Sequence, residues 1–238
     1  RKGKIMIKIA LIGLGSRGKN YGTHFAKRND AQIVAICDKY KEKIDKVKNL
    51  WKVSDEMCFT DEKDFFALGK VADCMLIATQ DRDHYAHAMK ALELGYDVLV
   101  EKPLSPNIEE CLEIEEFARK QGRKVLVCHV LRYANYYRKI KELIDGGVLG
   151  EIQLIKHDEN ISYWHFCHSY VRGNWRSESE TSPMLLAKCC HDMDLMYWFT
   201  GSKCKSLSSY GSLSFFNKEH KPKDATDNCF DCPRRMTC

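Results

Sequence analysis

The chain has 238 residues, of which 44% are hydrophobic and 30% are charged, and its formal net charge at pH 7 is +5. This composition is typical of a folded globular protein and excludes an intrinsically disordered chain. The positive charges are spread along the sequence without a basic block, so we expect no nucleic-acid partner.

The apolar runs are too short for a membrane-spanning protein. None approaches the roughly 18 residues of a spanning helix, and the first residues lack the separate apolar region and cleavage site of a signal peptide. We therefore expect no membrane partner and a cytoplasmic protein. Most of the 12 cysteines lie inside apolar runs, where a reduced thiol behaves as a small buried hydrophobe.

Apolar runs alternate with helical patterns over the first half of the chain. The expected strands are Ile5–Ile12, Ala31–Cys37, Met57–Thr60, Asp73–Thr79, Asp97–Val100 and Lys124–His129. The expected helices are Lys19–Arg28, Lys39–Trp51, Asp61–Leu68, Asp83–Leu94 and Pro106–Lys120. Several strands are continuous apolar runs, as in sheets covered on both faces, so this order predicts an α/β fold with a doubly wound parallel sheet.

A glycine-rich turn separates the first expected strand from the first expected helix. The segment Gly13-Leu-Gly-Ser-Arg-Gly18 has the form G-x-G-x-x-G, which in this position is the dinucleotide-binding fingerprint of a Rossmann domain. Gly13 permits the tight turn, Gly15 lets the backbone approach a pyrophosphate, and Gly18 lets the helix pack on the strand. The helix N-terminus offers unpaired N–H groups to the phosphates.

The second expected strand is followed by Asp38. Its carboxylate is placed to accept hydrogen bonds from the adenosine ribose hydroxyls. The same charge repels the 2′-phosphate of NADP, although Lys39 follows at once and softens that repulsion. We therefore expect NAD as the cofactor, with NADP less favoured.

The pattern changes after Val130. The expected elements are helices at Asn135–Asp145 and Met184–Phe199 and strands at Gly150–Tyr163 and Lys203–Phe216. The first of these helices is closed by Gly146-Gly147, which suits a linker. We expect a cofactor-binding domain over residues 1–130 and a second domain over residues 131–238.

Between these elements, Tyr163–Arg176 is rich in aromatic residues and contains His165 and His168. The H-x-x-H spacing, with His157 upstream, lacks a clear carboxylate partner, so we expect no metal here. We interpret the segment as an irregular loop that lines a substrate pocket and stacks on a sugar ring. The alternative is a loop packed under the second sheet.

The end of the sequence holds Cys229, Cys232 and Cys238. A closed structural zinc site requires four ligands, and only three thiolates are present. We therefore predict that this segment binds no metal.

Five short motifs occur in a fixed order along the chain. They are the glycine turn, Ala78-Thr79-Gln80 with His84, Glu101-Lys102-Pro103, Gly150-Glu151-Ile152, and His191-Asp192-Met193-Asp194-Leu195. In this order and spacing the chain resembles the glucose–fructose oxidoreductase/inositol dehydrogenase (Gfo/Idh/MocA) family. The resemblance implies a second α/β domain with an open, mostly antiparallel sheet that mediates homo-oligomers. It also implies oxidation of a sugar or cyclitol hydroxyl, or reduction of the matching ketone.

The resemblance implies roles for individual residues as well. Lys102 and His191 correspond to the catalytic residues, with His191 as acid or base. The positions implied to bind the cofactor are Gly13, Gly15, Ser16, Arg17, Gly18, Asp38, Thr79, His84, Glu101, Trp175 and Arg176.

Two features depart from the family pattern. Many polyol dehydrogenases of the family carry an aspartate four residues before the histidine, whereas this chain has Ala187, followed by Lys188. Residues three apart share a helix face, so Lys188 is a candidate substrate residue beside His191. The second domain is also shorter than in the family, and we expect it to be incomplete.

The positions of Lys102 and His191 suit hydride transfer. Lys102 follows a parallel strand at the sheet edge where ligands bind, and its ammonium would polarise a reacting oxygen. A histidine exchanges protons near neutral pH. We predict an NAD-dependent dehydrogenase. The alternatives are an NAD-using glycoside hydrolase with transient redox chemistry and a non-catalytic NAD-binding subunit.

Overall fold

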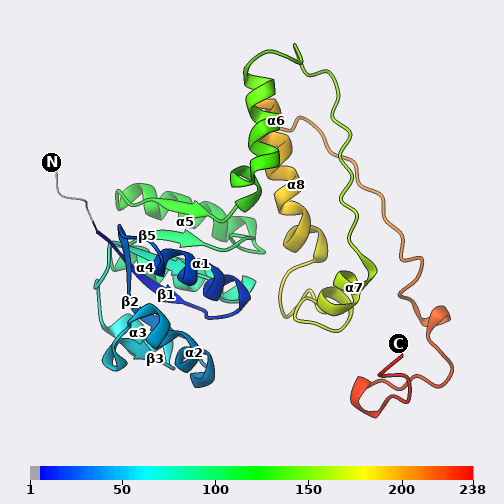
Figure 1. Cartoon of the computed structure of the whole chain (residues 1–238). Coiled ribbons are helices and arrows are strands. Elements are labelled where there is room, and N and C mark those ends of the chain that lie inside the picture. The colour runs from blue at the N-terminus through cyan, green and yellow to red at the C-terminus, as the bar shows by residue number, and fades with distance from the viewer. Residues whose placement is uncertain (1–5, 238) are drawn as a thin grey trace. The chain divides into compact units, whose positions relative to one another are not determined.

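The computed structural model describes residues 6–237, and Figure 1 shows their course. The chain divides into two compact units, Arg1–Gly201 and Ser202–Cys238. The first unit contains every strand among the described residues. The second contains the short 3₁₀ turns η5 (Lys218–His220) and η6 (Cys229–Asp231).

The first unit is built on a six-stranded parallel sheet. Its strands are β1 (Ile7–Ile12), β2 (Ala31–Cys37), β3 (Cys58–Phe59), β4 (Cys74–Ile77), β5 (Asp97–Val100) and β6 (Val125–Val127). They are ordered β3-β2-β1-β4-β5-β6, and every pair is parallel. This is the order of a Rossmann sheet, in which the strand order reverses between β1 and β4 and leaves a ligand crevice at their carboxyl ends.

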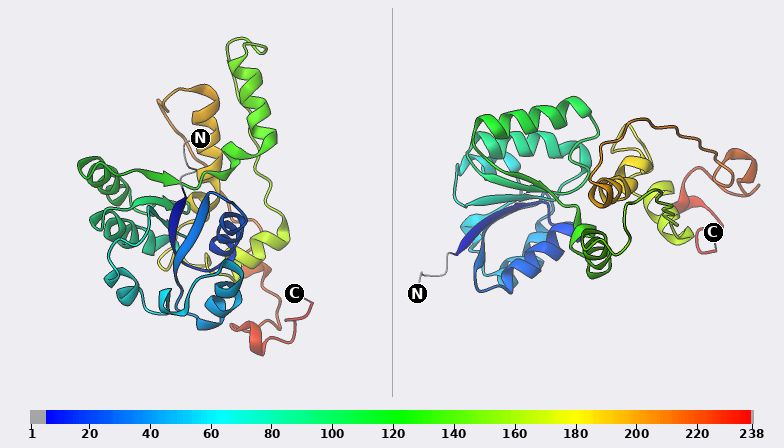
Figure 2. Two further views of the ribbon diagram at one scale, coloured as in Figure 1. Left: turned by 60° about the vertical axis from the view of Figure 1, so that its left-hand side comes forward. Right: turned by 90° about the horizontal axis from the view of Figure 1, so that it is seen from above.

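Helices cover both faces of the sheet, as seen from above in Figure 2. They are α1 (Ser16–Ala26), α2 (Lys41–Trp51), α3 (Glu62–Ala67), α4 (His84–Glu93) and α5 (Ile108–Lys120). One apolar core forms against α4 and α5 and includes Ile77 and Ile114. The other forms against α2 and includes Leu11 and Trp51. The buried apolar runs predicted as strands therefore have a covered face on each side.

The regular elements described after β6 are all helical, and extended segments connect them. A 3₁₀ turn, η3 (Val130–Tyr133), leads into α6 (Asn135–Asp145), and α7 (Tyr163–Phe166) continues as a π-helix, η4 (Cys167–Val171). The last helix of the unit is α8 (Met184–Thr200). Helices α6 and α8 lie side by side (Figure 1). They are in contact through Tyr137 and Phe199, whose ring centroids are 6.4 Å apart.

The two strands predicted after residue 130 are wrong. Gly150–Tyr163 and Lys203–Phe216 form no strand, and no strand follows β6 within residues 128–237. An extended segment becomes a strand only when a neighbour supplies its hydrogen-bond partners. Neither segment has such a partner, so the antiparallel sheet implied by the resemblance is not found in the described part of the second domain.

Smaller differences concern helix ends. The first helix begins at Ser16, directly after the glycine turn, and not at Lys19 as predicted. Helix α5 begins at Ile108 because Asn107 caps it by accepting a hydrogen bond from the Glu109 N–H at 3.0 Å. The stretch Tyr163–Arg176, predicted to be irregular, is helical over Tyr163–Val171.

Two general expectations concern the thiols and membranes. Eleven cysteines lie within the described residues, and all are free thiols. No helix in residues 6–237 is both long and apolar enough to cross a membrane. The predicted absence of a metal at the C-terminal cysteines involves Cys238, which lies outside the described residues.

Candidate active site

The glycine turn connects β1 to α1, and two of its three glycines leave no room for a side chain. Gly13 has φ +92, and a Cβ added there would lie 2.4 Å from the Ala78 carbonyl oxygen. A Cβ at Gly18 would lie 1.9 Å from the Gly13 carbonyl oxygen. At Gly15, by contrast, a Cβ would meet nothing within 4 Å. The first and third glycines are thus required for packing, while the second faces open space at the N-terminus of α1.

Asp38 is held at the carboxyl end of β2. Its side chain is buried, and its Oδ2 accepts hydrogen bonds from the Leu14 N–H at 2.7 Å and the Lys43 Nζ at 3.2 Å. Its Oδ1 accepts one from the Tyr40 N–H at 3.0 Å. These contacts fix the carboxylate beside the glycine turn, and Lys43 supplies a cation that the sequence reasoning overlooked.

A first cavity of about 390 Å³ lies along the carboxyl edge of β1, β2 and β4. Gly13, Gly15, Asp38 and Thr79 line it. The sequence reasoning missed His87, which joins them by bonding its Nδ1 to the Thr79 hydroxyl at 3.1 Å and its Nε2 to Glu62 at 2.9 Å. The first cavity therefore brings together the turn, the acid and the loop after β4 in the order that a dinucleotide requires.

His84 has a different position from these residues. It is fully buried, with Nδ1 2.7 Å from the Pro103 carbonyl oxygen and Nε2 3.3 Å from that of Thr79. It lines neither this cavity nor the next. His84 thus connects the loops after β4 and β5 by hydrogen bonds to their backbone and does not line either cavity.

A second cavity, of about 230 Å³, contains both predicted catalytic residues. It is lined by Arg17, Glu101, Lys102, Val130, His165, Ser169, Tyr170, Trp175, Ala187, Lys188 and His191. These residues come from α1, the loop after β5, η3, the segment from α7 to Trp175, and α8. Segments more than 80 residues apart in sequence meet here, since Lys102 Nζ donates a hydrogen bond to the Ala187 carbonyl oxygen at 2.7 Å.

Glu101 follows β5 and is almost completely buried. Its Oε1 accepts hydrogen bonds from Arg17 Nε at 2.9 Å and the Tyr21 hydroxyl at 2.7 Å, and its Oε2 accepts one from the Lys102 N–H at 2.9 Å. Burial alone would raise the pKa of Glu101, but the Arg17 and Tyr21 hydrogen bonds outweigh it and lower the pKa. Tyr21 was missed, although it lies four residues after Arg17 and hence on the same helix face.

His191 lies two turns into α8 and faces Lys102. Burial, followed by the charge of Lys102 and the neighbouring His129, lowers its pKa to about 4. The His129 and His191 ring centroids are 6.0 Å apart. Within the described part of the chain, the buried Nδ1 of His191 has no hydrogen-bond partner. The imidazole is therefore neutral near pH 7 and able to accept a proton.

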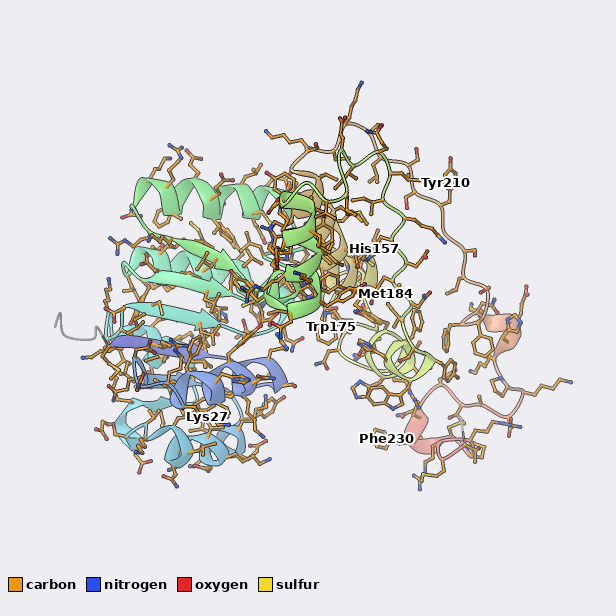
Figure 3. The ribbon with its side chains drawn as sticks, turned by 45° about the horizontal axis from the view of Figure 1, so that its top comes forward. Lys27, His157, Trp175, Met184, Tyr210 and Phe230 are labelled. Atoms are coloured by element: carbon orange, nitrogen blue, oxygen red, sulfur yellow. The ribbon has the colours of Figure 1, made fainter. Side chains whose placement is uncertain are left out.

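Trp175 belongs to the segment that leads from η4 to α8 (Figure 3). Its Nε1 donates a hydrogen bond to Oδ2 of Asp81 at 2.8 Å, and the Ser182 hydroxyl donates another to the same oxygen. Asp81 is only 3% exposed and lies in η2 (Asp81–Asp83), directly after the loop that follows β4. Asp81 thus joins the loop after β4, which lines the first cavity, to the segment that contains Trp175, a contact that sequence reasoning did not identify.

Besides His84 and Gly18, three further predicted residues line neither cavity. Arg176 is half-exposed and pairs with Glu180 at 3.0 Å. His168 stacks on Trp164 with ring centroids 5.1 Å apart. Ser16 is exposed at the first position of α1.

A cluster of possible metal ligands lies next to His191. Ligand atoms of His157, Glu159 and Asp192 are within 4.8 Å of one another. Two contacts already engage the cluster, because His157 Nε2 is 2.6 Å from Asp192 Oδ1 and Lys188 Nζ is 2.6 Å from Glu159 Oε1. The Lys188 ammonium therefore supplies positive charge at the place where a cation would bind.

Comparison with known proteins identifies the family. A family model described as an oxidoreductase family with an NAD-binding Rossmann fold matches residues 7–129, and a model of the GFO/IDH/MocA C-terminal domain matches residues 137–232. The chain belongs to the Gfo/Idh/MocA family of oxidoreductases. The resemblance noted from the sequence motifs is thereby confirmed, and so is the NAD-binding Rossmann domain.

Individual relatives are distant in sequence. D-glucoside 3-dehydrogenase of Escherichia coli is 29% identical over 147 residues, which cover 61% of this chain and 41% of that protein. Inositol 2-dehydrogenase/D-chiro-inositol 3-dehydrogenase of Halalkalibacterium halodurans is 25% identical over 204 residues, which cover 85% and 55%. The chain thus spans about half the length of the curated relatives it matches.

Solved structures agree in fold. Scyllo-inositol dehydrogenase from Lactobacillus casei, with bound NAD(H) and scyllo-inositol, superposes with a TM-score of 0.73 at 27% identity. The match covers 82% of this chain and 56% of that one. The fold is therefore shared well beyond the Rossmann domain.

Proposed function

We propose that this protein transfers a hydride between the nicotinamide of NAD and a hydroxyl or ketone carbon of a sugar or cyclitol. The observation that carries the proposal is the position of Lys102 and His191 in one cavity, at the carboxyl end of β5. The relatives named as glucoside and inositol dehydrogenases support the substrate class.

The first cavity has the features that a dinucleotide requires. The open space at Gly15 and the N-terminus of α1 suit a pyrophosphate, and the fixed carboxylate of Asp38 suits ribose hydroxyls. NAD would supply the hydride acceptor at C4 of its nicotinamide. Binding, orientation and proton transfer fall to the side chains of this chain.

Lys102 and His191 have different roles at the reacting hydroxyl. The Lys102 ammonium, oriented by the Ala187 carbonyl, stabilises the negative charge that develops on the oxygen. His191 is neutral near pH 7 and takes the hydroxyl proton on oxidation, or returns it on reduction. Glu101 holds Arg17 beside them through an ion pair of 2.9 Å.

We also propose that the cofactor-binding domain ends at residue 130 and that residues 131–238 form the second domain, which mediates a homo-oligomer. The support for this boundary is the end of the sheet, since β6 closes at Val127. The buried contacts of α8 with the Rossmann domain then belong to the interface between the two domains.

The experiment is turnover of the full chain with NAD and a panel of sugars, cyclitols and their glycosides, following NADH and identifying the product by NMR. Lys102→Ala should lower turnover by about 100-fold while NAD binding persists, because an electrostatic catalytic group is lost. Lys120→Ala, an exposed lysine on α5, is the matched control. Cleavage of a glycoside without net NADH would instead favour the hydrolase, and NAD binding without turnover a non-catalytic subunit.

A further inference from the structure

The second cavity is rich in cationic hydrogen-bond donors. Among the described residues that line it, Arg17, Lys102 and Lys188 are positively charged, whereas Glu101 is the one carboxylate. Glu101 pairs with Arg17, and Glu159, which does not line the cavity, pairs with Lys188. Three positive charges and these two carboxylates leave a net charge of one positive unit. The cavity therefore favours a ligand with negative charge.

The carboxylate of Glu101 is already engaged. Each of its oxygens accepts a hydrogen bond from the protein, with Arg17 and Tyr21 on Oε1 and the Lys102 N–H on Oε2. A hydroxyl of a neutral sugar would have to compete with these donors. The side chain one helical turn before His191 offers no acceptor either, because it is Ala187.

The two lysines keep donors for a ligand. An ammonium has three N–H groups. Lys102 gives one to the Ala187 carbonyl oxygen, and Lys188 gives one to Glu159. Both lysines line the second cavity together with His191, so they lie near the reacting centre. Lys102 is committed to the reacting oxygen, and this leaves Lys188 for another part of the substrate.

We propose that the substrate of the second cavity is a sugar acid, and that Lys188 binds its carboxylate. This inference rests on the proposed function and names its substrate class. A carboxylate brings a negative charge and several acceptor lone pairs to a site that offers donors. Lys188 is then a specificity-determining residue, one helical turn from the histidine that exchanges the proton.

The test compares matched sugars in the full chain with NAD. The probes are D-glucuronate against D-glucose and D-galacturonate against D-galactose, and the measured quantity is the ratio of kcat/KM for acid over neutral sugar. We expect a ratio of about 10 or more, as a single charge-assisted contact provides. Lys188→Met should remove most of this preference through KM, and Lys188→Arg should retain it. Lys120→Met controls for the loss of one positive charge elsewhere.

The outcomes separate this inference from the proposed function. A ratio near one, or a preference that survives Lys188→Met, overturns the sugar-acid assignment and leaves the dehydrogenase intact. If no probe is turned over, calorimetric titration of the NAD-saturated protein decides. Tighter binding of the uronates, lost in Lys188→Met, supports the assignment although turnover fails, and equal or absent binding of acid and neutral sugars overturns it.

Discussion

At the scale of single residues, His191 combines burial with two neighbouring lysines, and this gives it a pH signature. Its pKa is lowered from 6.5 to about 4 in the folded chain. Between these values the unfolded chain binds the extra proton and the folded chain does not, so stability rises with pH across this window. The stability that the neutral His191 contributes to the folded chain is therefore fully present above pH 6.5 and is lost as the pH falls towards 4.

We therefore predict that the Tm falls as the pH is lowered from about 6.5 towards 4, and that His191→Gln reduces the slope. His129, whose pKa burial also lowers, contributes to the slope that remains. Thermal melts across this range measure both. A slope unchanged in His191→Gln would mean that other groups carry the acid sensitivity.

Asp38 supports a second prediction. Its carboxylate is fixed next to the glycine turn, so Asp38→Asn should weaken NAD binding by about 10-fold and narrow the preference over NADP. Calorimetric titration of the two cofactors measures the preference. Asp30→Asn, directly before β2 and at the opposite end of that strand from Asp38, is the control. Stronger binding of NADP by the unmodified protein would show that Lys43 and Lys39 outweigh the acid.

At the scale of elements, the hydrogen bonds of Asp81 connect the loop after β4 to the segment before α8. We predict that Asp81→Ala raises the substrate KM by about 10-fold, with NAD affinity nearly unchanged, because two hydrogen bonds to a buried carboxylate are lost. Asp81→Asn keeps an acceptor and should restore much of the KM.

The partner of that contact provides the control. Trp175→Phe removes the indole donor, and its effect on KM should not add to that of Asp81→Ala, since residues that share a contact are coupled. Steady-state kinetics of the two single variants and the double variant measure this. Fully additive effects would mean that the two residues act separately.

The elements differ in how far sequence predicts them. Strands β2 and β5 were predicted with their observed ends, because an apolar run buried on both faces needs no knowledge of its neighbours. The segments Gly150–Tyr163 and Lys203–Phe216 have weaker alternation, and a strand there depends on a partner. Their periodicity alone was insufficient.

The sequence likewise predicts some residues of the candidate site and misses others. Lys102 and His191 were found through short motifs, and the structure brings them together. Asp81 was not found, because in sequence it lies in Asp81-Arg82-Asp83, which has the appearance of an exposed charged turn. Its hydrogen-bond partners Trp175 and Ser182 lie 94 and 101 positions away in the sequence, and a local pattern does not reveal contacts at such separations.

At the scale of the whole molecule, the two compact units allow a separation of roles. Every residue that lines the first or second cavity precedes Gly201. We predict that a chain ending at Gly201 binds NAD within about twofold of the full chain, since distant sites contribute independently. Cofactor titration and thermal melts of both chains test this. A large loss of affinity would show that residues 202–238 support the cofactor site.

The contact between Lys102 and Ala187 bears on how this site tolerates mutation. The acceptor is a backbone carbonyl oxygen of α8, so no substitution at position 187 can delete it. Ala187 is 2% exposed, so the volume of the side chain at this position, and not its hydrogen-bonding capacity, decides which substitutions the fold tolerates. A deep mutational scan should accordingly accept glycine or serine at 187 and reject large residues. The orientation of Lys102 thus depends on the backbone position of α8, which changes less during evolution than the identity of any one side chain.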